Sequence, residues 1–442
     1  MTVGDIMKKI IIAGAGHGGL TAGAYLAKNG YDVTVYEKRE KAELGHDWED
    51  RFTFDLLTEI TGKSIDEFPD GSWRYRGDCV FVSPAKRKRV EVKYTDETRQ
   101  KIMWRKPLIN MLLENAENAG VKFRFGTEII KPVIENSAVK GIETADGAIY
   151  GDLVIDAAGA FSPVRSNLPE SFGIELMPKH GDLFYAYRAY FNRDESYDIP
   201  AEPFEVYMYH EGEKGLSWFC TNEKTCDVLI GRIDKLTDEK VKEQLAIFKK
   251  DHPWLGSEII NGGNYGIIPV RRPLTLMVAD GYAALGDSAF MTMPMNGMGI
   301  DLSLYAGKLL AETVIKSNGD MSKKALWQYN AAFHKLYGGD ASKNEGLKNA
   351  ILSLPSSGVD FLFESEVIQS GDLAGAGRNT KLSALLGKFV RGMKQPPSFF
   401  TLLGGLIKGG KASKLYKSAP AQYDESAVKA WSDKIAELDI KL

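Results

Sequence analysis

The 442-residue sequence predicts an α/β fold in three parts: a domain with a parallel sheet, an antiparallel sheet interleaved with that domain in the chain, and a helical C-terminal region. Three observations predict it. Residues 9–37 have the pattern of a strand, a helix and a second strand, residues 184–233 alternate short aromatic-rich strands, and the chain from about residue 322 is mostly helical in pattern. Because single cores stop growing at about 250–300 residues, two or more substructures are expected.

Residues 9–37 carry the most specific pattern. Strands are expected over 9–13 and 32–36, and a helix over 20–28. Three glycines in the spacing G-x-G-x-x-G fill the turn between the first strand and the helix: Gly14, Gly16 and Gly19. Strand, glycine turn, helix and strand together are the fingerprint of a Rossmann-like dinucleotide-binding domain.

Each part of this fingerprint has a physical role toward a dinucleotide. Gly14 permits the tight turn, Gly16 lets a pyrophosphate approach the backbone, and Gly19 lets the helix and strand pack closely. The helix start offers free N–H groups and a partial positive charge to the phosphates. Glu37 ends the second strand, where a carboxylate can accept hydrogen bonds from ribose hydroxyls, and its charge argues against a 2′-phosphate.

Composition excludes several classes of protein. A formal net charge of -3 gives no reason to expect a nucleic-acid partner. The three cysteines, Cys79, Cys220 and Cys226, are widely spaced and form no metal-ligand pattern, so we expect reduced thiols, no metal and a cytoplasmic location. There is no run of 18 apolar residues that would span a membrane.

After Glu37 the chain alternates short elements up to residue 165. Residues 38–51 are polar and predict a loop. The elements that follow are expected as a helix over 52–60, strands over 75–82 and 89–94, a helix over 104–120, a strand over 121–125, a hairpin turn at 145–147 between strands near Gly141 and Tyr150, and a strand over 152–155. The basic run 84–89 is either a solvated hairpin tip or a phosphate site.

The second half begins with the antiparallel sheet over 184–233 and a helix over 238–250. A short strand over 282–285 then ends on Gly286 and Asp287, and a Met-, Gly- and Pro-rich loop leads to a helix over 299–315. A strand-end acid beside a glycine-rich helix start is placed for contact with a ligand.

Three motifs therefore stand in a fixed order: residues 14–19 (GAGHGG), 156–165 (DAAGAFSPVR) and 286–299 (GDSAFMTMPMNGMG). This order resembles the flavoprotein superfamily that includes p-hydroxybenzoate hydroxylase. The segments 264–273 (NYGIIPVRRP) and 278–287 (VADGYAALGD) resemble the geranylgeranyl reductase-like branch of that superfamily.

The resemblance implies FAD as the cofactor. Glu37 would hold the adenosine ribose, Asp287 would contact the pyrophosphate and ribityl chain, and the loop 294–299 would face the isoalloxazine. Arg105 matches an arginine near the ribityl chain, or is a surface arginine at a helix end, and the loop 38–51 either lies near the flavin ring or is solvated. The cofactor-binding residues expected are Gly14, Gly16, Gly19, Glu37, Lys38, Arg105, Gly159, Gly286, Asp287, Pro294, Gly297 and Gly299.

The resemblance also predicts a division into domains. The FAD-binding domain is expected to take 1–75, 95–180 and 264–320; the antiparallel-sheet substrate domain 76–94 and 181–263; and the helical C-terminal region 321–442.

Two departures from the resemblance affect the expected chemistry. The hydroxylases usually carry an acid where this chain has Ala158, which argues against direct reduction by NADPH. The reductase branch tends to end an aromatic pattern in Pro, whereas the stretch 215–221 keeps Trp218 and Phe219 and lacks the Pro. The electron donor is open between NAD(P)H and an electron-donor protein.

Three functions compete at this point. The first is an FAD-dependent reductase of C=C bonds in a hydrophobic, isoprenoid-like substrate, with Cys220 or Tyr207 as proton donor. The second is a flavin-dependent aromatic monooxygenase, and the third is an electron-transfer flavoprotein module. The absence of a cysteine cluster for iron and sulfur argues against a built-in electron relay.

The segment 383–418 mixes Leu and Phe with Lys and Arg and contains no acid. It is either a peripheral contact with an anionic membrane or a helical cap that buries its apolar face on the domain. Two glycine pairs, Gly404-Gly405 and Gly409-Gly410, argue against a long continuous helix.

Overall fold

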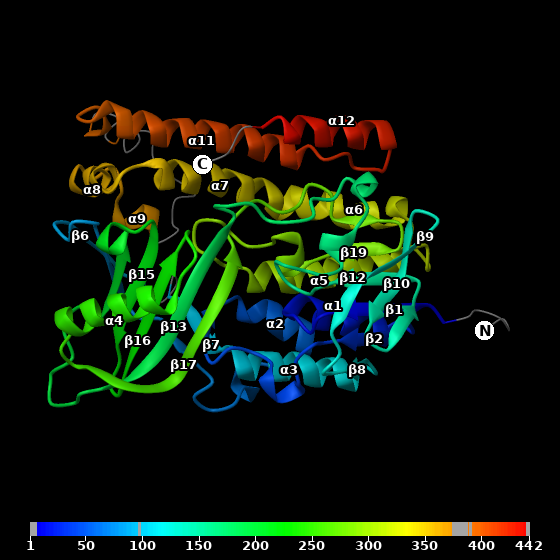
Figure 1. Cartoon of the computed structure of the whole chain (residues 1–442), viewed down its shortest axis with the longest axis horizontal. Coiled ribbons are helices and arrows are strands. Elements are labelled where there is room, and N and C mark those ends of the chain that lie inside the picture. The colour runs from blue at the N-terminus through cyan, green and yellow to red at the C-terminus, as the bar shows by residue number, and fades with distance from the viewer. Residues whose placement is uncertain (1–6, 96–98, 374–387, 389–390, 439–442) are drawn as a thin grey trace.

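The computed structural model describes residues 7–95, 99–373, 388 and 391–438. A seven-stranded sheet occupies one end of the molecule and a six-stranded sheet the other (Figure 1). The C-terminal helices form a layer along one side of both sheets (Figure 1). The mixed α/β architecture predicted from the sequence is confirmed.

The six-stranded sheet has the order β18-β19-β12-β1-β2-β8 and is parallel apart from β18. Its strands are β1 Lys9–Ala13, β2 Asp32–Tyr36, β8 Lys122–Arg124, β12 Leu153–Asp156, β18 Val278–Ala279 and β19 Tyr282–Ala284. Helix α1, His17–Lys28, packs against α3, Arg105–Asn118, and α5, Ile300–Lys316. The first two strands have the predicted bounds.

Helix α1 begins at His17, three residues before the predicted start, with Gly16 as its N-cap. Of the three motif glycines, Gly14 therefore precedes the helix, Gly16 caps it and Gly19 lies in its first turn. A Cβ at Gly19 would lie 3.0 Å from the Ile12 side chain, so Gly19 does permit the close helix–strand packing that the sequence predicted.

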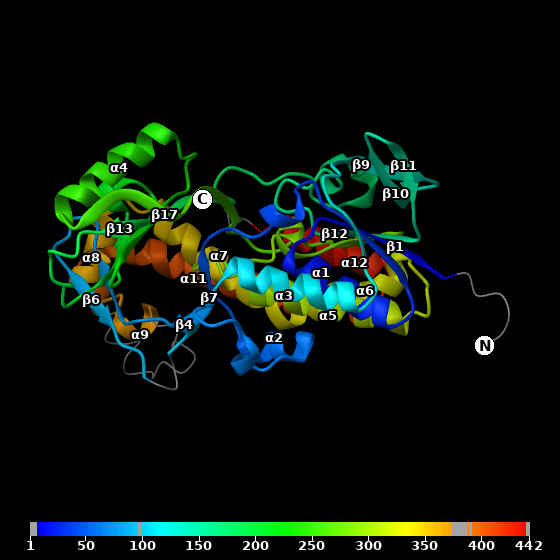
Figure 2. The ribbon, with the colours of Figure 1, turned by 90° about the horizontal axis from the view of Figure 1, so that it is seen from below.

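A small antiparallel sheet, β11-β10-β9, projects at the end of the molecule opposite to the seven-stranded sheet (Figure 2). It consists of β9 Ile129–Glu135, β10 Ala138–Thr144 and β11 Gly147–Tyr150. Gly141 lies opposite Tyr150, which confirms the predicted hairpin. Strand β9 was not predicted.

The seven-stranded sheet has the order β17-β13-β16-β15-β14-β5-β6. Its strands are β5 Cys79–Val82, β6 Arg89–Val92, β13 Leu183–Arg193, β14 Phe204–Met208, β15 Gly215–Thr221, β16 Thr225–Arg232 and β17 Leu255–Pro269. Helix α4, Asp238–Asp251, packs on it through Phe248. Strand β17 runs past the boundary expected after residue 263.

The prediction of one strand over 75–82 was wrong. The chain leaves β4, Trp73–Tyr75, and enters β5 four residues later, and the two strands belong to different sheets. Strand β4 joins β7, Lys101–Trp104, and β3, Glu49–Arg51, in a three-stranded sheet. Strand β3 lies inside the segment predicted to be a loop, and helix α2, Phe54–Thr61, follows it.

The C-terminal region is helical, as predicted. Its helices are α6 Lys323–Phe333, α7 Gly339–Ser353, α8 Ser356–Glu364, α9 Ser370–Leu373, α11 Pro396–Lys417 and α12 Glu425–Ala436, with a π-helical turn over His334–Gly338 between α6 and α7. None of the helices in the described part of the chain is long and apolar enough to cross a bilayer. Residues 383–387, 389 and 390 of the basic segment lie outside the described residues.

The glycine pairs do not interrupt α11, so the expectation of a broken helix was wrong. Gly405 and Gly409 lie one turn apart at the crossing of α11 with α7. A Cβ at Gly405 would lie 2.5 Å from the Gly346 carbonyl oxygen, and one at Gly409 2.6 Å from that of Lys343. Close contact between two backbones requires small residues, and here it offsets the poor helix propensity of glycine.

Candidate functional site

The glycine turn after β1 forms one wall of a large cavity. Gly14 has φ +93, and a Cβ there would lie 2.6 Å from the Ala157 carbonyl oxygen, so the tight turn requires glycine. Glu37 accepts hydrogen bonds from the backbone N–H groups of Ala15 at 2.8 Å and Arg39 at 3.0 Å. The end of β2 and the glycine turn are therefore tied together at the cavity wall.

The middle motif connects the carboxyl ends of two neighbouring strands. Asp156 is fully buried and accepts hydrogen bonds from the hydroxyls of Ser162 at 2.6 Å and Tyr282 at 2.9 Å. Gly159, with φ +90, donates its N–H to the Ser288 hydroxyl at 2.8 Å. This network fixes the loop after β12 against the loop after β19.

The late motif forms the opposite wall. Asp287 follows β19 in a short helical turn, and Thr292 donates to its carboxylate at 3.4 Å. Burial raises the pKa of Asp287, while the nearby Arg105 charge and the Thr292 hydrogen bond lower it. Pro294, Gly297 and Gly299 line the same wall just before α5 begins.

The cavity enclosed by these walls has a volume of about 1700 Å³. All of the cofactor-binding residues predicted from the sequence line it except Gly19, which packs in the protein interior. Lys38 is exposed at its rim. The motifs at residues 14–19, 156–165 and 286–299 are thus brought together around one space, as parallel strands that end at one sheet edge require.

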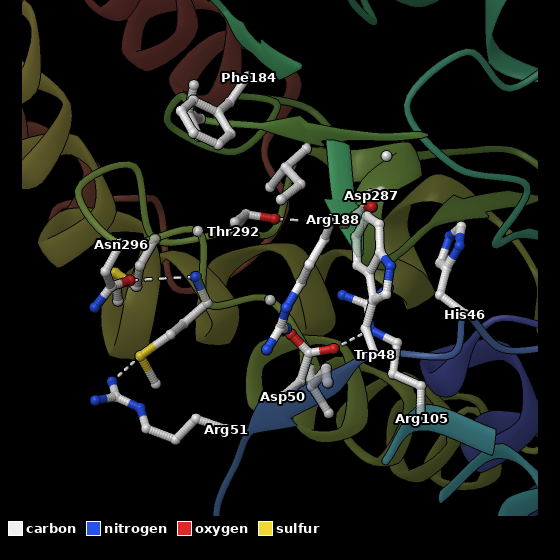
Figure 3. Close-up of a pocket in the computed structure, with 18 of the residues that line it drawn as sticks. His46, Trp48, Asp50, Arg51, Arg105, Phe184, Arg188, Asp287, Thr292 and Asn296 are labelled. Atoms are coloured by element: carbon white, nitrogen blue, oxygen red, sulfur yellow. Dashed lines mark hydrogen bonds and ion pairs between the residues drawn. The ribbon is translucent and has the colours of Figure 1, made fainter. Parts of the chain in front are cut away.

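The segment before β3 covers one side of the cavity, so the surface-loop interpretation holds for the exposed residues 38–43 and was wrong for residues 44–51. Trp48 is buried, and its ring stacks on His46 with ring centroids 4.7 Å apart. The Arg105 guanidinium lies 5.4 Å from the Trp48 ring centroid and forms an ion pair with Asp50 (Figure 3). Arg105 is therefore a cavity residue and its charge is balanced.

Two bidentate ion pairs also lie in the cavity wall. Arg188 on β13 donates to both carboxylate oxygens of Asp227, at 2.9 and 2.7 Å. Arg74 donates to both carboxylate oxygens of Glu49, at 2.8 and 2.7 Å. Burial by itself would lower the pKa of Arg188, but the Asp227 carboxylate outweighs it and the pKa is raised.

The two proton-donor candidates are placed very differently. Cys220 lines the cavity, and burial followed by the charge of Asp227 raises the pKa of its thiol to about 12. Tyr207 does not line it: this side chain packs under α4 against Phe248 and donates to Glu205 at 2.7 Å. Side chains alternate along β14, so Val206 and Met208 face the cavity and Tyr207 faces away.

The cavity continues into an apolar arm beneath the C-terminal helices. One side of the arm comes from the seven-stranded sheet and the segment after β16, and the other from α7, α8, α9 and the segment between α8 and α9. Its apolar lining residues include Phe184, Ile233, Ile268, Leu347, Ile351, Leu352, Phe363, Ile368 and Leu373. The polar and apolar regions belong to one continuous space.

Sequence reasoning missed Arg74 and Arg188 as cavity residues, and it placed Trp48 only within a loop that either lies near the flavin ring or is solvated. The sequence feature that could have indicated the position of Trp48 is Gly266 of β17, where a Cβ would lie 2.6 Å from the indole ring. A glycine inside a strand often marks close approach by another group. The ion pair of Arg188 with Asp227 depends on the pairing register of β13 and β16, which the sequence pattern does not specify.

The cavity fits the FAD that the sequence resemblance implies. No described residue accepts a hydrogen bond from the backbone N–H groups of Gly16 or His17 at the start of α1. The buried Nε2 of His17 is also without a partner, and burial together with Arg105 lowers the pKa of this histidine to about 4. A Cβ at Gly159 would meet no atom within 4 Å. These donors and this open space suit a pyrophosphate.

Comparisons with known proteins agree with this geometry. The family model described as FAD binding domain matches residues 7–336. A digeranylgeranylglycerophospholipid reductase of Sulfolobus acidocaldarius is 22% identical over 443 residues, covering 94% of each chain.

Solved structures share the fold. A geranylgeranyl bacteriochlorophyll reductase-like protein from Thermoplasma acidophilum has a TM-score of 0.71 at 19% identity, covering 90% of this chain and 100% of that one. A probable FAD-dependent monooxygenase from Pseudomonas aeruginosa has a TM-score of 0.58 at 19% identity, covering 79% and 97%.

Proposed function

Because the chain belongs to the FAD binding domain family, we propose that it is an FAD-dependent reductase of C=C bonds in a long isoprenoid-like lipid. The observation that carries this proposal is the apolar arm, which opens from the cofactor-sized part of the cavity. The volume of about 1700 Å³ exceeds the roughly 300–1000 Å³ of a typical small-ligand pocket. Space therefore remains for a long apolar chain beside the cofactor.

Reduced FAD, when bound, supplies a hydride equivalent to a carbon–carbon double bond. The protein must then position the double bond, exclude water and provide one proton. The apolar arm serves the first two tasks. We propose Cys220 for the third, because its thiol lines the cavity and keeps its proton at neutral pH.

The test is an anaerobic reduction of the purified flavoprotein, with NADH, NADPH and dithionite compared as donors. A polyprenyl lipid added afterwards should reoxidise the flavin and leave a saturated product, detected by mass spectrometry. In the Cys220→Ala variant this reoxidation should slow while flavin content stays unchanged. Failure of every prenyl lipid to reoxidise the flavin would contradict the proposal.

The same experiment separates the other candidate functions. Oxygen uptake that depends on an aromatic substrate and yields a hydroxylated product would identify a monooxygenase. The probable monooxygenase from Pseudomonas aeruginosa shares this fold. Reoxidation only by a partner protein would identify an electron-transfer module. If dithionite reduces the flavin and neither NADH nor NADPH does, an electron-donor protein is the physiological source.

Replacement of Asp287 by Ala is expected to weaken FAD binding by about tenfold or more with little loss of fold, since hydrogen bonds to charged groups contribute about 1.5–3 kcal/mol. Burial raises the pKa of this carboxyl, so its ionised form costs folding free energy at neutral pH and its removal should not unfold the apoprotein. FAD titration and thermal unfolding of the apoprotein measure the two effects. Unaltered flavin affinity would refute the assignment.

We further propose that the protein acts in the cytoplasm as a peripheral membrane protein that contacts anionic lipid through α11. Three apolar side chains of this helix are exposed: Phe400 at 51%, Leu406 at 37% and Ile407 at 52%. The helix also carries four lysines and no acidic residue. Exposed apolar residues with a basic complement suit the headgroup region of an anionic bilayer.

Co-sedimentation with vesicles tests this contact. The protein should bind anionic vesicles more tightly than neutral ones at low salt, and Phe400→Glu with Ile407→Glu should remove the difference. Ile130→Glu, at an exposed apolar position on β9, is the matched control and should bind as the wild type does. Equal affinity for both kinds of vesicle would contradict the membrane proposal and leave the FAD assignment intact.

A further inference from the structure

Two neighbouring arginines of the cavity wall, Arg51 and Arg76, have no carboxylate partner among the described residues. The exposed Arg39, which also lines the cavity, has none there either. Arg51 of β3 donates instead to neutral groups, the side-chain oxygen of Gln100 and the sulfur of Met298. Arg76, between β4 and β5, places its guanidinium 5.1 Å from the Phe204 ring centroid. Neither arginine takes part in an ion pair in the described part of the chain.

The neighbouring basic residues are neutralised. Within the cavity, Arg74 pairs with Glu49, Arg105 with Asp50 and Arg188 with Asp227. In the basic hairpin between β5 and β6, every cation is paired: Lys86 with Glu211 and Asp251, Arg87 with Glu364, Lys88 with Glu366, and Arg89 with Glu202 and Glu205. The hairpin, considered from the sequence as a phosphate site, is therefore a charge-balanced surface.

The unpaired positive charges of Arg51 and Arg76 lower the stability of the folded protein. Burial, and after it the proximity of Arg76, lowers the pKa of Arg51 to about 10, so the side chain remains a cation at neutral pH. Partly buried cations without a counter-charge destabilise a fold, and proteins usually pair them. An anionic ligand in the cavity would supply the missing charge.

The position of this pair matches a lipid that has one polar end. Arg51 contacts Met298, so the pair lies beside the loop 294–299. The same loop borders the apolar arm, since a Cβ at Gly297 would lie 3.8 Å from Ile268. In Figure 3, Arg51 and Phe184 of the apolar arm lie at opposite margins of the view, with Thr292 between them.

We propose that Arg51 and Arg76 form a subsite for the phosphate or diphosphate head group of an isoprenoid substrate. The guanidinium of each residue can donate two parallel hydrogen bonds to phosphate oxygens. The chain of such a substrate would run from this subsite past the loop 294–299 into the apolar arm. This inference rests on the proposed function, because it assigns one end of the substrate of that same cavity.

Binding of saturated probes to the oxidised holoenzyme tests the subsite without turnover. Phytanyl phosphate and phytanol share one chain and differ only in the phosphate. By isothermal titration, the wild type should bind phytanyl phosphate roughly 10- to 100-fold more tightly than phytanol. Arg51→Gln and Arg76→Gln should each remove most of that preference without changing phytanol affinity or flavin content.

Two further variants and two further probes sharpen the result. Arg76→Lys keeps the charge and should retain part of the preference, and Arg124→Gln, an exposed arginine outside the cavity, should change nothing. Phytanyl diphosphate and phytanyl glycerophosphate distinguish a prenyl diphosphate from a phospholipid as the source of the head group.

Equal binding of phytanyl phosphate and phytanol by the wild type would overturn the subsite, as would Gln variants that weaken both probes alike. A phosphate preference that depends on the arginines, in a protein whose flavin no prenyl lipid reoxidises, would support the subsite and contradict the reductase proposal alone.

Discussion

Gly16→Val is expected to give a folded protein that purifies without FAD. Gly16 has φ -71 and ψ 161, a conformation that valine adopts readily, so the backbone tolerates the change. The new Cβ would lie 3.2 Å from the Ala157 carbonyl oxygen, and its methyl groups would occupy cavity space before the start of α1. We expect FAD affinity to fall at least about a hundredfold, or about 2.7 kcal/mol.

The measurement is flavin released on denaturation, together with a far-UV circular dichroism spectrum of the undenatured protein. Gly404→Val is the matched control, because a Cβ at Gly404, on the open side of α11, meets no atom within 4 Å. It should keep a full complement of FAD. A Gly16→Val protein that retains FAD would show that the cofactor does not approach this turn.

The parts of the site that could be predicted from the sequence are those in which local pattern and geometry coincide. The two strands of the first unit have their predicted bounds because one is an apolar run that ends at Gly14 and the other is an alternating run that begins shortly after Gly30. Gly14, Glu37 and Asp287 lie at strand ends, and parallel strands bring their carboxyl ends to one edge. The three motifs therefore converge without any long-range information.

The middle of the cavity could not be predicted because its residues meet only through tertiary contacts. Strand β3 has the sequence Glu-Asp-Arg, which carries no strand pattern, and its residues are bonded by Arg74, Arg105 and Gln100 from other segments. Tyr207 is the opposite case, a residue predicted for the site that the fold places outside it. Its residue type suits proton transfer, but alternation along β14 turns it away from the cavity.

The glycines of α11 have two different structural roles. Helix propensity predicts that two Gly-Gly pairs weaken a helix by about 1 kcal/mol per glycine relative to alanine. The structure uses one glycine of each pair, Gly405 and Gly409, to bring the backbones of α11 and α7 together. The partners Gly404 and Gly410 face open space. Propensity is local and cannot distinguish these two roles.

Gly409→Val is therefore expected to separate α7 from α11 and to disturb the apolar arm. A Cβ at Gly409 would lie 2.6 Å from the Lys343 carbonyl oxygen, and backbone atoms cannot move aside as a side chain can. Overpacking of this kind costs about 1–3 kcal/mol. Leu347 and Ile351 of α7 line the apolar arm, so affinity for a long apolar ligand should fall together with stability.

Gly410→Val is the matched control at the next position of the same helix. A Cβ at Gly410 meets no atom within 4 Å, and valine has a better helix propensity than glycine, so stability should be unchanged or slightly higher. Denaturant unfolding and phytanol titration of both variants measure the contrast. The FAD content of both should stay at the wild-type level, because the glycine turn after β1 is far from the crossing in sequence and belongs to another layer (Figure 1). Equal stability of the two variants would mean that the crossing of α7 and α11 does not hold this wall of the cavity in place.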